Sequence, residues 1–167
     1  ALNNIAMALD DSGQPDSAAV YILQSIEMSR AANDWYGLSK TLTNLALLNR
    51  DLERWDEVEP LFMEAIEYKK RVDDFYGISS CYLNLASYQW NDLGDADNAL
   101  VSNDIALEIA EKNNFVRILH KLYKQRSKLM AAKGRPQEAY DLMFRSSNLS
   151  DSLNQAENTE ALLEIET

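Results

Sequence analysis

Apolar positions along the chain recur at the spacing of an amphipathic helix. Leu38, Leu42 and Leu45 fall at i, i+4 and i+7, which places them on one face of a helix. After the polar break "NRDLER", a second apolar face begins with Val58 and Phe62, again four residues apart. No segment shows the strict alternation of a half-buried strand. The pattern therefore predicts pairs of helices joined by short polar turns.

The same helix pair returns at a fixed interval along the chain. The segment "WYGLSKTLTNLALL" begins at Trp35, and its counterparts "FYGISSCYLNLASY" and "FVRILHKLYKQRSKLM" begin at Phe75 and Phe115. The start of the chain fits the same template with its opening six positions missing. A fixed period of about 40 residues is typical of helical repeat proteins. Four units are predicted, followed by the start of a C-terminal helix: 1–34, 35–74, 75–114 and 115–154 for the units, and 155–167 for the helix.

Capping residues mark where the helices begin. Asp34, Asp74 and Asn114 stand directly before the first helix of a unit, where each side chain can accept a hydrogen bond from a free backbone N–H group. Gly37 and Gly77 lie in the first turn of two of these helices, and we expect them to permit close packing between helices. The organisation predicted from these signals is eight helices in antiparallel pairs.

The repeat resembles the tetratricopeptide repeat. In that family a Leu-small pair lies on the first helix, as in "NIA" and the two "NLA" segments here, which end at Ala6, Ala46 and Ala86. A turn glycine precedes an alanine of the second helix by five residues in three units: Gly13 with Ala18, Gly94 with Ala99, and Gly134 with Ala139. In the second unit the glycine is replaced by Glu53, and in the fourth unit Ser127 is expected to take the small position.

This resemblance implies a fold and a general function. Tetratricopeptide units stack their apolar faces into an all-α, right-handed α-solenoid with a concave inner wall, and small residues let the helices approach closely. We therefore expect about four helix pairs and a C-terminal capping or connector helix. The unit is longer than the roughly 34 residues of the common repeat and is similar to the longer repeats of bacterial signalling proteins. The implied function is non-catalytic binding of a protein or peptide.

Charge and composition exclude two other classes of function. The chain carries 27 acidic against 16 basic residues, a net charge of −11, so nucleic-acid phosphates would repel it. No nucleic-acid partner is therefore expected. No apolar run approaches the roughly 18 residues of a membrane span, so no span is expected in this segment.

Residues that carry chemistry are few. The five glycines are scattered, so no phosphate-binding loop is present, and one cysteine with one histidine does not make a zinc site. Cys81 and His120 lie on neighbouring predicted first helices and form a conceivable nucleophile pair. A lone helical cysteine is more often a small core residue, and no third orienting group is evident. We expect no catalytic residue, no metal and no cofactor in this segment.

Three asparagines occupy the same slot on successive first helices. These residues are Asn4, Asn44 and Asn84. In the tetratricopeptide family this slot tends to face the concave groove, where an amide can donate to and accept from a bound peptide backbone. Alternatively, the amides bond to the neighbouring helix. The sequence leaves both interpretations open.

Basic residues concentrate in one stretch of the chain. Residues 112–135 contain eight of the 16 basic residues and no acid. Within this stretch Lys121, Lys124 and Lys128 fall at i, i+3 and i+7 of one helix face, which is predicted to line the groove. One hypothesis is that these lysines, with the asparagines, bind an acidic peptide or protein segment. The other is that they balance acids of the preceding helix, in surface pairs that each contribute about 0–1 kcal/mol. The acids concerned are Asp104, Glu108 and Glu111.

Some tetratricopeptide domains clamp the terminal carboxylate of a peptide with Asn and with Lys or Arg from successive first helices. Asn84 and Lys121 match two such positions. Thr43 and Leu47 stand at the positions of the second unit that would complete the clamp. The resemblance therefore implies a looser groove for an acidic peptide rather than a true clamp.

The segment "SDSLNQAENTEALLEIET" at the end of the chain resembles the end of tetratricopeptide sensor regions in bacterial membrane-tethered histidine kinases and helix-turn-helix regulators. That resemblance implies a connector toward an output domain, a periplasmic or extracytoplasmic location, and a homodimer through this helix. Four residues fit heptad core spacing, and Glu160 interrupts them. They are Leu149, Leu153, Ala156 and Leu163. A helix that caps the last repeat is the alternative, and the two roles are compatible.

The sequence therefore predicts the sensor or interaction region of a larger bacterial signal-transduction protein. A free-standing tetratricopeptide scaffold or adaptor without signalling output, with a cytoplasmic location, is the alternative. A fragment of an enzyme whose catalytic domain lies elsewhere is a third interpretation. A membrane span and kinase motifs encoded after Thr167 would support the first interpretation, and a stop codon would support the second.

Overall fold

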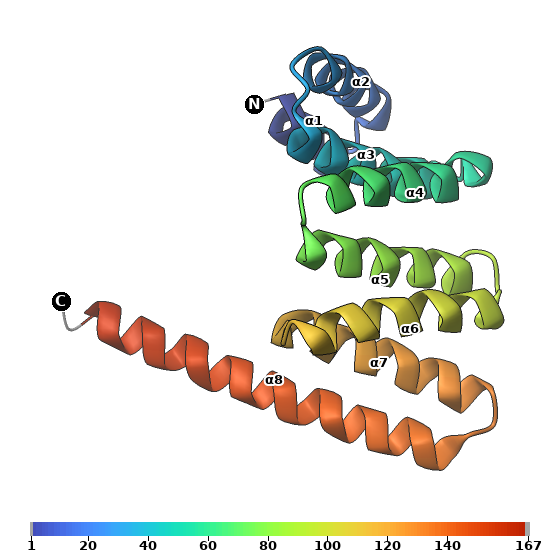
Figure 1. Ribbon diagram of the computed structural model, residues 1–167, viewed down its shortest axis with the longest axis vertical. Coiled ribbons are helices and arrows are strands. Elements are labelled where there is room, and N and C mark those ends of the chain that lie inside the picture. Colours follow the sequence, from blue (N-terminus) through green and yellow to red (C-terminus); the bar gives the residue numbers. More distant parts are fainter. Residues whose placement is uncertain (1, 166–167) are drawn as a thin grey trace. The chain divides into compact units, whose positions relative to one another are not determined.

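A computed structural model describes residues 2–165, with side chains described for residues 2–156. Helices joined by short turns make up this whole range, and no strand occurs in it (Figure 1). The helices are α1 (Leu2–Asp11), α2 (Pro15–Ala31), α3 (Trp35–Asp51), α4 (Trp55–Arg71), α5 (Phe75–Asn91), α6 (Ala96–Lys112), α7 (Val116–Ala132) and α8 (Pro136–Ile165). The predicted all-α fold class is confirmed. In the described part of the chain, no helix combines the length and the hydropathy needed to cross a membrane.

The chain divides into two compact units, and the division falls inside α5. Unit 1 is Ala1–Cys81 and unit 2 is Tyr82–Thr167. In unit 1, α1 packs against α2, α2 against α3, and α3 against α4. In unit 2, α6 packs against α7, and α7 packs against α8. Each unit is therefore built from helical hairpins, as expected for an α-solenoid of tetratricopeptide-type pairs.

Aspartates cap the first helices of two hairpins, as the sequence predicts. Asp34 Oδ1 accepts a hydrogen bond from the Gly37 N–H at 2.9 Å, and Asp74 Oδ1 accepts one from the Gly77 N–H at 2.8 Å. A Cβ added at either glycine would collide with the carboxylate of its capping aspartate. At Gly37 the three nearest atoms all belong to the cap, so the expectation of close helix packing is wrong there and the glycine makes room for the cap instead. At Gly77 the Lys69 Nζ of α4 also lies 2.7 Å from the added Cβ, so this glycine makes room both for the cap and for the neighbouring helix.

The last hairpins are shifted by one residue from the predicted period. The helix α5 ends at Asn91, which is 40 residues after the end of α3 at Asp51, as predicted. The helix α6 starts at Ala96, which is 41 residues after the start of α4 at Trp55. The extra residue therefore lies in the turn between α5 and α6. As a result Phe115, and not Asn114, is the N-cap of α7, and it makes no side-chain cap bond. Asn114 instead adopts a left-handed backbone with φ of 54°, so its predicted role as a cap is wrong.

Small residues pack where the helices of a hairpin approach. Ala6 and Ala46 in unit 1 and Ala86 in unit 2 are fully buried. Ser127 of α7 lies at the same distance from its helix start as Ala46 and Ala86, and it is buried as well. Its hydroxyl donates to the Ala139 carbonyl oxygen of α8 at 2.8 Å, so the buried polar group has a partner. A serine therefore fits this small position.

Candidate ligand-binding surfaces

The three lysines that the sequence singles out lie together on one face of α7. We call Lys121, Lys124 and Lys128 the α7 lysine row. All three are exposed, and Arg117, one turn earlier on the same face, is exposed too. Leu122, which points away from this face, is fully buried. The structure thus presents four cations along one solvent-facing side of unit 2.

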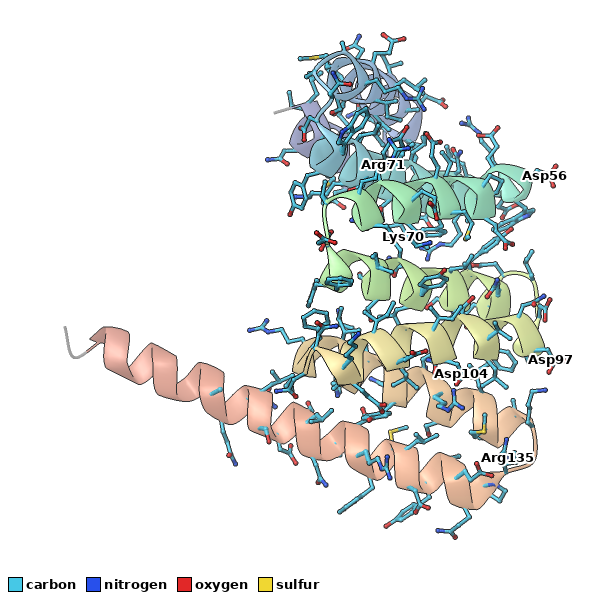
Figure 2. The ribbon with its side chains drawn as sticks, viewed as in Figure 1. Asp56, Lys70, Arg71, Asp97, Asp104 and Arg135 are labelled. Carbon is cyan, nitrogen blue, oxygen red and sulfur yellow. The ribbon has the colours of Figure 1, made fainter. Side chains whose placement is uncertain are left out.

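The neighbouring acids of α6 are engaged by other residues of α7. Arg126 forms an ion pair with Asp104, which Figure 2 labels on α6. The Tyr123 hydroxyl donates to Glu111 Oε1 at 2.8 Å, and burial, with this carboxylate, raises the pKa of Tyr123. The α7 lysine row forms no ion pair with any residue whose side chain is described. Of the three acids expected to balance the row, Asp104 is thus paired with Arg126, and Glu111 accepts a hydrogen bond from the neutral Tyr123 hydroxyl.

A buried polar network fixes the rotation of α7 within unit 2. The Gln125 Nε2 group donates to Ser87 Oγ of α5 at 2.8 Å, and Gln125 Oε1 accepts from Asn103 Nδ2 of α6 at 2.9 Å. Asn103 is fully buried, and its Oδ1 accepts a further bond from Arg126 at 3.3 Å. Because buried amides are costly to leave unpaired, this network holds the lysine row on the solvent side.

Gln125, which sequence reasoning missed, takes the asparagine slot in α7. Counted from the helix starts, it is equivalent to Asn44 of α3 and Asn84 of α5. A strictly constant period instead puts Lys124 at this position. Two features of the sequence point to Gln125 at this position: it is an amide residue directly beside Lys124, and the turn before α6 is longer by one residue.

The three asparagines of the predicted ladder have different surroundings. The Asn44 Nδ2 group donates to Asn3 Oδ1 at 3.0 Å, which joins α3 to α1 within unit 1. Asn4 is exposed and lines a cavity of about 440 Å³ formed by α1, α2 and α3. Asn84 is half-buried on α5. The Asn44 amide is thus engaged with a neighbouring helix, whereas Asn4 borders an open cavity.

Another cavity of unit 1, of about 240 Å³, is lined by an ion pair whose lysine is buried. We call it the Lys69 cavity. Lys69 Nζ lies 3.2 Å from Asp74 Oδ2, and Lys69 is only 5% exposed. The exposed rings of Tyr36 and Tyr76 also line the cavity, with Lys40 Nζ 5.7 Å from the centroid of the Tyr36 ring. Nothing in the sequence pointed to this site, because the run "YKKR" at a helix end is typical of solvated charges.

Cys81 and His120 are each held by partners in their own unit. Cys81 Sγ is buried 3.4 Å from Thr43 Oγ1, and burial raises the pKa of the thiol, which disfavours a reactive thiolate. His120 Nδ1 lies 2.9 Å from the Ser146 carbonyl oxygen, and Ser146 Oγ donates to the His120 carbonyl oxygen at 2.9 Å. Among the described side chains, no group of three His, Cys, Asp or Glu residues is arranged to hold a metal ion.

Comparison with known proteins points to the same class of fold. Residues 1–34 match the family model described as tetratricopeptide repeat, with the bounds of the first predicted unit. The crystal structure of BtubC (BKLC) from P. vanneervenii is similar to this chain, with a TM-score of 0.76 and 21% sequence identity over 92% of the chain. This chain spans 63% of the length of that BtubC chain. No curated protein matches the sequence. These findings support a protein of tetratricopeptide-type helical repeats, as the sequence resemblance implies.

Proposed function

We propose that this chain is a non-catalytic module that binds a protein or peptide, and that the α7 lysine row binds an acidic segment of this partner. Repeats of the tetratricopeptide type generally mediate interaction between proteins. The observation that supports an acidic partner is the row itself. Lys121, Lys124 and Lys128 are exposed together, and no described side chain forms an ion pair with them.

The physical chemistry of the row favours an anionic ligand. Like charges three or four residues apart destabilise a helix by about 0.2–0.5 kcal/mol per pair, and a bound anion relieves this repulsion. Elsewhere the chain is acidic, with a net charge of −11, so the long-range field disfavours contact of an acidic ligand with most of the surface. Carboxylates that reach two or more of the lysines gain charge-assisted hydrogen bonds. The ligand is therefore a segment with several closely spaced acids.

Charge reversal of the row tests this function. An octapeptide of alternating Glu and Ser, fluorescently labelled, is titrated with the whole chain, and its anisotropy gives the Kd. The double variant Lys121→Glu with Lys124→Glu is expected to bind about 100-fold more weakly, because two attractive contacts become repulsive.

The matched control carries the same change of charge in unit 1, through Arg54→Glu with Lys70→Glu, at two exposed residues. This control is expected to keep its Kd within about twofold of the original, because exposed charges that do not contact the ligand are screened by salt. An unchanged Kd for the row variant, or an equal loss in the control, would contradict the proposed site.

We also propose that the module is the sensor or interaction region of a larger bacterial signal-transduction protein. Support comes from α8, which has 30 residues where its hairpin partner α7 has 17 (Figure 1). Leu149 packs against the core of unit 2, whereas Ala156, one turn past the half-buried Leu153, is exposed. Glu160 and Leu163 of the predicted heptad lie outside the described side chains. A helix that is packed at one end and extended at the other is suited to transmit a conformational change of the repeats or to pair with a second copy of the chain.

The coding sequence beyond Thr167 tests this second proposal. A membrane span followed by kinase or helix-turn-helix motifs is the expected result. A stop codon at that point would favour the free-standing scaffold or adaptor instead. Sedimentation velocity adds a second readout, because a connector helix that pairs with a second copy should make the protein sediment as a dimer.

A further inference from the structure

Lys69 is a buried cation at a position that holds small residues in other hairpins. Counted from the helix starts, Lys69 of α4 is equivalent to Ser29 of α2 and Ala110 of α6. Its side chain is only 6% exposed. Burial of an ammonium group is costly unless the charge is paired and hydrogen-bonded. A lysine at this core position therefore calls for an explanation beyond packing.

The ion pair with Asp74 satisfies only part of the hydrogen-bonding capacity of the Lys69 ammonium. Asp74 Oδ2 lies 3.2 Å from Lys69 Nζ, while Asp74 Oδ1 accepts the capping bond from the Gly77 N–H. An ammonium has three N–H donors, and Asp74 is its only acceptor among the described residues. Buried donors are nearly always hydrogen-bonded. The remaining donors of Lys69, which lines the cavity, are available to an acceptor from outside the chain.

The lining of the Lys69 cavity suits a single negative charge. Its volume of about 240 Å³ is enough for one amino-acid side chain, and Ser80 supplies a hydroxyl to its wall. The Cys81 thiol stays neutral, because burial raises its pKa. The charged groups that line the cavity are Lys40, Lys69 and Asp74, which leaves one net positive charge. A monoanion balances this charge, whereas a dianion would also face the Asp74 carboxylate.

Exposed aromatic rings flank the cavity. Tyr36 is 55% exposed and Tyr76 is 48% exposed. Tyr36 and Lys40 also line the larger cavity of about 440 Å³, so these two residues lie between that cavity and the Lys69 cavity. Exposed tyrosines offer apolar contact area at a small entropic cost. An extended peptide that crosses Tyr36 can therefore rest on the rings while one of its side chains enters the Lys69 cavity.

We propose that the Lys69 cavity receives one carboxylate, the side chain of a Glu or Asp residue in a bound peptide. Lys69 donates its remaining N–H groups to this carboxylate, and Lys40 approaches it from the surface. Tyr36 and Tyr76 contact the peptide residues on either side. This inference rests on the proposed protein-binding function, but it concerns a surface of unit 1, whereas the α7 lysine row belongs to unit 2.

An NMR titration of the whole chain tests the inference. The probes are the pentapeptide Ac-Ala-Ala-Glu-Ala-Ala-NH2 and the same peptide with Gln in place of Glu. The Glu peptide is expected to shift the amide signals of Gly77 and Ser80 and to bind about tenfold more tightly than the Gln peptide. Lys69→Ser, which introduces the residue type found at Ser29, is expected to remove this tenfold preference. Lys40→Gln changes an exposed side chain, leaves the core intact, and is expected to weaken Glu-peptide binding about threefold.

Controls separate the possible outcomes. Lys70→Ser, at the exposed neighbour on the same helix (Figure 2), is expected to leave the preference for Glu unchanged. Equal binding of the two peptides, or an unchanged preference in both the Lys69 and the Lys40 variants, would overturn the inference. Displacement of the Glu peptide by inorganic phosphate at concentrations below the Kd of the peptide would also overturn it, in favour of a phosphate site. The Lys121→Glu, Lys124→Glu variant should keep the shifts at Gly77 and Ser80, so failure of this site and failure of the lysine row give different results.

Discussion

At the scale of single residues, Glu53 has a strained backbone at a position where the other units have glycine. It adopts a left-handed backbone with φ of 57° in the turn between α3 and α4. Gly13, Gly94 and Gly134 hold the equivalent position in the other hairpins, with similar φ values. Glycine adopts this conformation without a steric penalty from Cβ, whereas glutamate does not. The departure of the second unit from the family pattern is therefore a site of backbone strain.

Replacement of Glu53 by glycine should stabilise the protein. The variant Glu53→Gly is expected to raise the free energy of unfolding, measured in urea, by about 1 kcal/mol. Gly94→Ala is the reciprocal change, because a Cβ at this position meets no atom within 4 Å and only the backbone is strained. It should lower the free energy of unfolding by about 1 kcal/mol. A loss of stability in Glu53→Gly would show that the glutamate side chain stabilises the fold by more than the backbone strain destabilises it.

The Cys81 thiol predicts a dependence of stability on pH. Burial raises the pKa of this thiol above its ordinary value of 9.0. The folded state therefore prefers the protonated thiol, and its stabilising effect is complete below pH 9 and lost as pH rises from 9 through the folded-state pKa. Urea unfolding should show that the free energy of unfolding declines between pH 8 and pH 10, and that this decline is smaller in Cys81→Ala. The same decline in both proteins would assign it to other groups.

At the scale of elements, α8 differs from the second helices of the inner hairpins. Phe62 of α4 is fully buried, whereas the equivalent Met143 of α8 is 43% exposed. Ile66 of α4 is buried as well, and its equivalent in α8 is the exposed Ser147. Terminal repeats of solenoids carry polar residues where inner repeats carry apolar ones. This pattern supports the capping role expected for the C-terminal helix.

Truncation at these two equivalent positions should give very different losses of stability. Phe62→Ala is expected to cost about 3–5 kcal/mol, because it leaves a cavity in a close-packed core. Met143→Ala is expected to cost less than about 1 kcal/mol, because the side chain is already partly in solvent. Urea unfolding of both variants measures the difference. Comparable losses would mean that α8 is covered by another surface in solution.

The sequence predicts the elements better than it predicts the sites. Apolar spacing, turn glycines and the Asp34 and Asp74 caps are local signals, and the structure contains the helices they predict. The extra residue before α6 shows in the sequence only as glycine spacing, because Gly94 follows Gly13 by 81 residues instead of 80 and a polar turn accepts three or four residues equally well. This insertion moves Gln125 into the slot that a strict period gives to Lys124. Lys69 was missed because burial of a long polar side chain depends on tertiary packing, which residue type alone does not reveal.

At the scale of the whole molecule, an acidic chain carries two separate sites of positive charge. The α7 lysine row lies in unit 2, and the Lys69 cavity lies in unit 1. The row is open and offers several cations, so it suits a run of acids. The cavity is lined by three charged groups with one net positive charge, so it suits a single carboxylate.

An NMR map of the Glu–Ser octapeptide on the isotopically labelled whole chain tests the α7 lysine row directly. A ligand bound at the row is predicted to give the largest shifts on the side chains of Lys121, Lys124 and Lys128. The Kd is also predicted to rise steeply with salt, because the interaction is between exposed charges. Shifts confined to another face of the protein, or equal binding of an octapeptide with Gln in place of Glu, would contradict binding at the row.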